Sequence, residues 1–139
     1  MPVTLDAILA ARERLRPVLP VTPCPESIAL SEITGARIYC KLDNLQRTGS
    51  FKERGARNAL ELLGPEHRQR GVIAASAGNH ALGLAYHGSL LGIPVTVVMP
   101  EFAPLIKLST CQRLGARVVQ EGASFAEARA KADAIALAE

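Results

Sequence analysis

The sequence predicts an α/β fold, in which a parallel sheet carries helices on both faces. The main observation is that short apolar strand signals alternate with helix signals from residue 71 onward. Such alternation is typical of right-handed βαβ units, whose strands run parallel. Alanine is abundant, and small side chains let helices lie close to a sheet. Apolar types make up 48% of the chain and charged types 21%, as in ordinary globular proteins.

The first 50 residues predict one helix and one strand. Thr4 caps the helix and Pro17 ends it. A proline-rich stretch over residues 17–25 is expected to be extended. Polar and apolar residues alternate over residues 37–42, which predicts a strand followed by a loop.

The signals sharpen from Ser50 onward. Ser50 and Glu53 form a capping box, with serine at the N-cap and glutamate three residues later. The helix that they open is stopped at Gly64-Pro65. Beyond it, strands are predicted at residues 71–75, 95–99 and 117–120. Helices are predicted at residues 78–91, 104–114 and 124–139, the last opened by a second capping box.

Length and composition exclude several classes of protein. A chain of 139 residues can bury a real core, and its net charge of +3 is too small for a disordered chain of this apolar content. Aromatic residues are only 4%, which leaves little stacking surface for nucleic acid. Charged residues interrupt every long apolar run, including the N-terminal one. We therefore expect no nucleic-acid partner, no membrane partner and no signal peptide.

Cysteines and histidines give no metal or disulfide pattern. Three cysteines are widely spaced, so the sequence predicts no disulfide framework and a reducing, cytoplasmic location. The histidines have no carboxylate or cysteine neighbours at metal-ligand spacing, so no metal site is expected. His87, in the middle of a predicted helix, is expected to be a partly buried structural residue.

The first candidate for chemistry is Lys52, in the first turn of the helix that Ser50 caps. A helix N-terminus carries about half a positive charge, which disfavours an ammonium there by roughly 0.3–1 kcal/mol. A lysine held where its charged form is disfavoured is a better amine nucleophile for a carbonyl and a better base. The position therefore suits a lysine that forms a Schiff base. A solvent-exposed lysine on a capped helix is the alternative with the same spacing.

The second candidate is the run Ser76-Ala77-Gly78-Asn79-His80, which combines a strand end, a tight turn and a helix start. Backbone N–H groups and the helix dipole make such a turn an anion site for a carboxylate or phosphate. The run also lies at the carboxyl end of a predicted parallel strand, where open α/β sheets bind ligands. The alternative is that Ser76 only caps the helix.

Together the two runs resemble one enzyme family. Residues 41–56, KLDNLQRTGSFKERGA, resemble the cofactor-attachment region of threonine dehydratases, which are fold type II pyridoxal-phosphate enzymes of the tryptophan synthase β-like group. Residues 76–81, SAGNHA, are similar to the substrate-binding loop of that family. The resemblance covers essentially the whole chain from about Thr22, and it implies the same fold in incomplete form.

The resemblance implies a role for each matching residue. Lys52 matches the lysine that bonds pyridoxal 5'-phosphate (PLP) covalently and later moves the α-proton of the substrate. Phe51 matches the ring that packs beside the cofactor, and Asn79 matches the residue that hydrogen-bonds its ring oxygen. The loop that receives the substrate carboxylate corresponds to Ser76, Ala77, Gly78, Asn79 and His80.

The implied reaction is β-elimination of a small amino acid. L-threonine would give 2-oxobutanoate and ammonia, and L-serine would give pyruvate and ammonia. Ala77 stands where serine racemases carry a serine that acts as acid and base, which favours elimination over racemisation. A serine racemase, a threonine synthase-like enzyme and a non-catalytic truncated module are the alternatives. The resemblance also implies amino-acid metabolism, with isoleucine biosynthesis as one role and a catabolic role left open, and a homo-oligomer in the full-length form.

The resemblance also divides the chain. Residues 1–50 correspond to the opening elements of the large PLP domain, and residues 51–139 to the small α/β domain without its last strand. Family members are much longer, and their glycine-rich phosphate loop normally lies beyond the equivalent of Glu139. We therefore expect an N-terminal portion that is inactive alone and binds the cofactor weakly.

Overall fold

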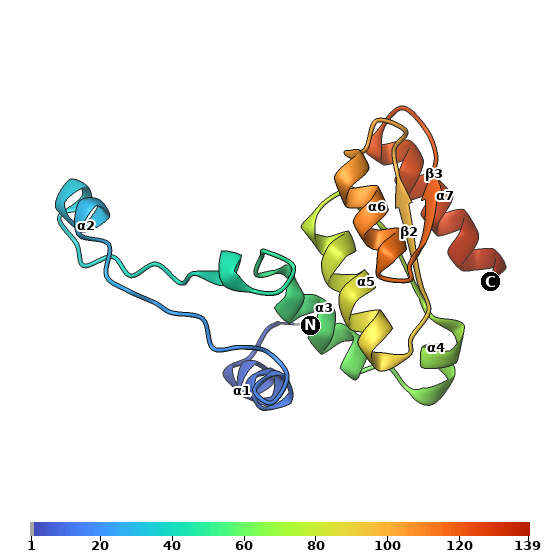
Figure 1. The fold of residues 1–139 in the computed structure, drawn as a ribbon. Helices are drawn as coiled ribbons and strands as arrows, with labels where there is room; N and C mark the ends of the chain where they lie inside the picture. The colour runs from blue at the N-terminus through green and yellow to red at the C-terminus, as the bar shows by residue number, and fades with distance from the viewer. Residues whose placement is uncertain (1) are drawn as a thin grey trace. The chain divides into compact units, whose positions relative to one another are not determined.

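The computed structural model describes residues 2–139, which form two compact units (Figure 1). The first unit ends at Phe51, and the second spans Lys52–Glu139. Both clusters of buried apolar side chains lie in the second unit, together with the whole parallel sheet. Within the described residues, no helix is long and apolar enough to cross a membrane.

The first unit contains two α-helices and a short 3-10 helix joined by extended segments. α1 spans Leu5–Leu15, and the Thr4 hydroxyl caps it by accepting the Ala7 N–H at 3.2 Å, as predicted. α2 spans Ile28–Thr34, and the 3-10 helix η1 spans Asp43–Leu45.

The prediction of a strand over residues 37–42 is wrong. The segment is extended, but it makes only an isolated antiparallel bridge with the chain before α2. The Cys40 N–H donates to the carbonyl oxygen of Pro25 at 2.9 Å. The Leu42 N–H likewise donates to that of Pro23 at 3.0 Å. Because proline has no N–H to donate in return, the two segments cannot build a full ladder.

The second unit is built on a parallel sheet of three strands in the order β1-β2-β3. β1 spans Val72–Ala75, β2 spans Val95–Met99 and β3 spans Arg117–Gln120. The central strand β2 pairs in parallel with both of its neighbours. The predicted strands and their parallel arrangement are confirmed.

Five helices complete the second unit: α3 (Lys52–Glu61), α4 (Pro65–Arg70), α5 (Asn79–Leu91), α6 (Leu105–Arg113) and α7 (Phe125–Ala138). Four of them match predicted helices, whereas α4 does not. Its signal is nevertheless present in the sequence, because Gly64 is its N-cap and Pro65 occupies the first helical position. Proline favours that position, where its missing N–H costs nothing.

Helices cover both faces of the sheet, as predicted. Val97 and Met99 of β2 are fully buried in a cluster formed with α5 and α6. Val98, between them, points to the other face and packs with Ala128 and Ala132 of α7. The two alanines are small enough for α7 to lie close to the sheet. Figure 1 shows α6 and α7 on opposite sides of strands β2 and β3.

Candidate active site

Lys52 is the first residue of α3, and its side chain is exposed. The start of α3 is held against α5. A Cβ built on Gly83 of α5 would lie 3.4 Å from the carbonyl carbon and oxygen of Lys52, at ordinary van der Waals contact, so the two backbones run close together here. Glu53 is fully buried, and its Oε2 lies 3.3 Å from Nε2 of His87 on α5. His87 is structural, as predicted, but it is 1% exposed rather than partly buried.

The loop between β1 and α5 carries the second motif. The Ser76 hydroxyl oxygen accepts hydrogen bonds from the N–H groups of Gly78 at 3.4 Å and Ala81 at 3.3 Å. Gly78 is the N-cap of α5, and the Ser76 hydroxyl accepts an N–H of its first turn; the part of Ser76 in substrate binding stays a prediction. The first N–H groups of a helix have no carbonyl partner within it. Those of Asn79 and His80 accordingly point out of the start of α5, at the carboxyl edge of the sheet.

Asn79 is exposed and is contacted from α6. The ammonium of Lys107 donates to the amide oxygen of Asn79 at 2.9 Å. Lys107 is the third residue of α6, and Asn79 is the first residue of α5. The two helices follow the neighbouring parallel strands β2 and β1, so their first turns start at the same edge of the sheet.

His80 is half-buried and lies within electrostatic reach of Lys52. Burial lowers the pKa of His80 below its ordinary value, and the positive charge of Lys52 lowers it further. Both causes favour the neutral imidazole. The two motifs, which are distant in the sequence, are therefore close in space.

The remaining predicted site residues are Ala77, Gly78 and Phe51. Ala77 and Gly78 lie half-buried in the loop beside Ser76. Phe51 is the last residue of the first unit, and its side chain is 62% exposed. Its position beside a cofactor stays a prediction.

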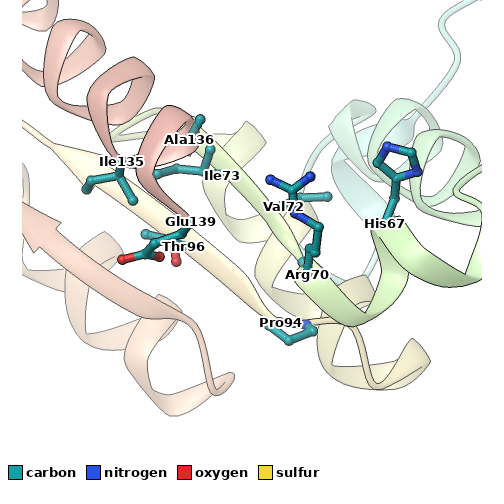
Figure 2. Close-up of a pocket in the computed structure, with 10 residues that line it drawn as sticks. His67, Arg70, Val72, Ile73, Pro94, Thr96, Ile135, Ala136 and Glu139 are labelled. Carbon is teal, nitrogen blue, oxygen red and sulfur yellow. The ribbon is translucent and has the colours of Figure 1, made fainter.

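A cavity of about 200 Å³ lies elsewhere in the second unit, as Figure 2 shows. It opens at the amino ends of β1 and β2, next to Val72 and Thr96, and Glu139 of the C-terminus lines its wall. The two motifs lie at the carboxyl end of β1. The cavity is therefore separate from the predicted site.

Sequence reasoning misses two residues that shape the site, Lys107 and Gly83. Neither belongs to a motif. Lys107 could have been found from the predicted topology, because the first turn of the helix after β2 must start beside the first turn of the helix after β1. Gly83 marks the place where α3 packs on α5, and its only signal in the sequence is a glycine inside a predicted helix.

The comparisons with known proteins identify the family of this chain. A family model described as pyridoxal-phosphate dependent enzyme matches residues 15–139. The chain belongs to the pyridoxal-phosphate dependent enzyme family. It is 51% identical over 126 residues to the L-threonine ammonia-lyase of Thermotoga maritima, covering 91% of this chain and 31% of that protein. It is 45% identical over 128 residues to the catabolic L-threonine dehydratase TdcB of Staphylococcus aureus, covering 91% and 37%. The chain thus spans about a third of the length of these relatives.

Among solved structures, maize serine racemase superposes on this chain with a TM-score of 0.90 and 29% sequence identity. The match covers 99% of this chain and 42% of the racemase. Both the resemblance to the pyridoxal-phosphate dependent enzyme family and the predicted fold class are therefore confirmed.

The residues at the carboxyl edge fit the cofactor of this family. PLP offers an aldehyde, a ring oxygen and a phosphate. Lys52 presents an exposed amine that can bond the aldehyde, and Asn79 presents an exposed amide that can bond the ring oxygen. The charge of Lys52 acts on His80, so the predicted lysine and the loop before α5 lie in the same region of the second unit.

Proposed function

We propose that the protein carrying this chain catalyses the PLP-dependent β-elimination of L-threonine or L-serine. The products would be 2-oxobutanoate or pyruvate, with ammonia. The observation that supports the proposal is the packing of α3 on α5, in which the Lys52 backbone lies against Gly83, Glu53 contacts His87 and the charge of Lys52 acts on His80. The two curated relatives, named for the reaction on threonine, support threonine as a substrate.

In this proposal Lys52 acts twice. Its Nζ holds the cofactor until the substrate amine replaces it, and then accepts the α-proton as a neutral general base. When bound, PLP supplies an electron sink for the charge left on the α-carbon. The neutral imidazole of His80 adds no second positive charge beside this amine. Asn79 holds the cofactor through its ring oxygen.

The loop has the chemistry to receive the substrate carboxylate. The N–H groups at the start of α5 and the helix dipole favour an anion there. A carboxylate held at this point would orient the α-carbon and its proton toward Lys52. The β-hydroxyl then leaves, and hydrolysis of the unsaturated amine gives the 2-oxo acid and ammonia.

Racemisation of serine is a second candidate, since the fold matches that of maize serine racemase closely. Racemisation needs a second acid–base group on the face opposite the lysine. Ala77 occupies the loop position where the racemase resemblance requires a serine, and a methyl group moves no proton. Elimination is therefore favoured.

Borohydride reduction of the PLP-loaded full-length protein, followed by peptide mapping, tests the attachment site. The chain holds four lysines, and we expect the label on Lys52 alone. Lys52→Arg should abolish the label, whereas Lys131→Arg, on the exposed face of α7, should keep it. Label on a different lysine, or on none, would refute the proposal.

Product analysis tests the reaction. The full-length protein should convert L-threonine and L-serine into 2-oxo acid and ammonia in equal amounts, with little D-serine. D-serine as the main product would favour the racemase, and formation of threonine would favour a threonine synthase-like enzyme. We expect the 139-residue chain alone to be inactive. An enzyme-like rate of 2-oxobutanoate release by this chain would contradict that expectation.

The finer expectations belong to the same proposal. They are a cytoplasmic homo-oligomer, the division into large-domain and small-domain parts near residue 50, and a role in isoleucine biosynthesis. Because the Staphylococcus aureus relative is named catabolic, we propose a direct test of the role. Loss of the gene should create a requirement for isoleucine if the role is biosynthetic.

A further inference from the structure

The contact between Lys107 and Asn79 fixes the direction of an amide. The Nζ–O distance is 2.9 Å, and it joins the first turns of α6 and α5. A lysine ammonium has three N–H donors and no acceptor, so the amide atom that it meets must be the oxygen. The amide nitrogen, with its two N–H donors, then lies on the other branch of the planar group. Lys107 therefore decides which way the Asn79 amide faces.

This direction matters for an anionic ligand. An asparagine side chain can turn over and present its oxygen where its nitrogen was, because the two ends have nearly the same shape. The ring oxygen of PLP accepts hydrogen bonds when it is ionised. It is stabilised by the N–H end of the amide and repelled by the oxygen end, and hydrogen bonds to an ionised group are about twice as strong as neutral ones.

We infer that Lys107 is a positioning residue that keeps the N–H donors of Asn79 toward the ring oxygen of the cofactor. The inference rests on the proposed role of Asn79. Lys107 is itself half-buried, whereas its neighbours Leu105 and Ile106 are 79% and 69% exposed. One turn further along α6, Cys111 is fully buried in the main apolar cluster. Lys107 is therefore presented to Asn79 by a helix that is anchored to the core.

Three substitutions of Lys107 separate the direction of the amide from the presence of a contact. Lys107→Arg keeps a group with donors only, so it should preserve the direction. Lys107→Met removes the hydrogen bond and leaves a side chain of similar length. Lys107→Glu offers acceptors only, so it should attract the amide nitrogen and turn the oxygen toward the cofactor.

The first readout is the apparent dissociation constant of PLP for the full-length protein, from absorbance titration. We expect Lys107→Arg to bind within about twofold of the unchanged protein, Lys107→Met about tenfold more weakly and Lys107→Glu about a hundredfold more weakly. The Met and Glu variants should also lose intensity in the absorption band of the ionised ring oxygen. The matched control is Arg113→Glu, an equal change of charge at the exposed far end of α6, which should change neither readout.

The second readout needs no cofactor. In NMR spectra of the chain labelled with ¹⁵N, the side-chain amide of Asn79 should be similar in the unchanged chain and in Lys107→Arg. In Lys107→Glu, one of its two protons should move downfield because it donates to the new carboxylate.

The outcomes are distinguishable from those of the proposed function. Equal PLP affinity for the Arg, Met and Glu variants, with Lys52 still labelled by borohydride, would overturn the inference and leave the proposed function standing. Absence of label on Lys52 in the unchanged protein would remove the proposed function itself. If the Glu variant does not fold, the Arg and Met variants decide: a clear loss in Met alone supports the inference, and equal affinities overturn it.

Discussion

Ionisable side chains from three helices surround the start of α5. Lys52 comes from α3, His80 from α5 itself and Lys107 from α6. Two of the three are cations, and the third is kept neutral partly by the charge of Lys52. A cluster of positive charge favours the binding of anions. The carboxylate of an amino acid and the ionised ring oxygen of PLP are both anionic groups.

The titration of His80 reports its distance from Lys52. We expect Lys52→Met to raise the pKa of His80, because one of the two causes of its lowering is removed. The pKa should still stay below the ordinary value of about 6.5, since burial remains. NMR of the imidazole C–H groups, followed from about pH 4 to about pH 8, measures the titration midpoint of His80, since this range brackets the ordinary pKa of histidine. Lys131→Met is the control, and an unchanged midpoint in Lys52→Met would place Lys52 away from His80.

The lowered pKa of His80 also makes the stability of the fold depend on pH. The unfolded chain takes up a proton on His80 as the pH falls below about 6.5, before the folded chain does. The free energy of unfolding therefore decreases as the pH is lowered from the ordinary pKa of histidine to the lowered pKa of His80 in the folded chain. His80→Gln, which does not titrate, should lose less stability than the unchanged chain over this interval.

At the scale of helices, the buried pair of Glu53 and His87 joins α3 to α5 (Oε2 to Nε2, 3.3 Å). Removal of one member of a buried pair typically costs about 3–5 kcal/mol, because the other stays buried without it. We expect Glu53→Leu and His87→Leu each to destabilise the fold on this scale. The double variant should be much less destabilised than the sum of the two.

Urea unfolding of the four proteins gives this coupling as a double-mutant cycle. Simple addition of the two losses would show that the pair does not act as a unit. Borohydride labelling of Lys52 in full-length versions of the same variants then shows whether loosening of α3 also misplaces the lysine.

Two glycines of α5 make a matched test of packing. A Cβ on Gly88 would overlap Cγ2 of Val95 and lie 3.0 Å from the carbonyl oxygen of Ile93. We expect Gly88→Ala to destabilise the fold by about 1–2 kcal/mol, because overpacking exceeds the gain of about 1 kcal/mol from helix propensity. A Cβ on Gly83 meets nothing nearer than 3.4 Å, so Gly83→Ala should keep or raise stability. Equal urea midpoints for the two variants would contradict this packing.

The helices and strands of the second unit could be predicted because their signals are local. The predicted N-cap at Ser124, for example, is present: the Glu127 N–H donates to the Ser124 hydroxyl at 3.2 Å. The strand over residues 37–42 could not be judged in the same way, because a strand needs a partner. The alternation of its residues says nothing about the prolines that face it.

The same distinction between local signals and long-range contacts applies to the candidate site. Lys52 and the Ser76–His80 loop carry their chemistry in their own sequence, so the motifs point to them. The contact of Lys107 with Asn79 and that of Gly83 with Lys52 depend on how three helices pack. Glu53 shows the limit most clearly, since its place beside Ser50 is local while the contact of its carboxylate with His87 in the core depends on how α3 and α5 pack.

At the scale of the whole molecule, the two units differ in how much apolar surface they bury. The second unit holds both apolar clusters, with residues such as Ala81, Val97 and Cys111 fully inaccessible. The buried residues described in the first unit are Leu15, Leu19, Thr22, Gln46 and Ser50. Large apolar side chains there stay open to solvent, including Val21 at 89% and Ile33 at 80%. Local stability follows buried apolar contact, so the first unit should open more readily than the second.

Hydrogen exchange of the backbone amides tests this difference. In the 139-residue chain, the amides of β2 and of the buried face of α5 should exchange at least about a hundredfold more slowly than those of the first unit, since only the former require the apolar core to open. Limited proteolysis should correspondingly cut first in the extended stretch between α1 and α2, where the backbone is not held in a helix or sheet. Equal protection of both units would show that the first unit is stabilised by more than its own buried side chains. The Gly88→Ala variant is the control, because it should lower protection in the second unit and leave the first unit unchanged.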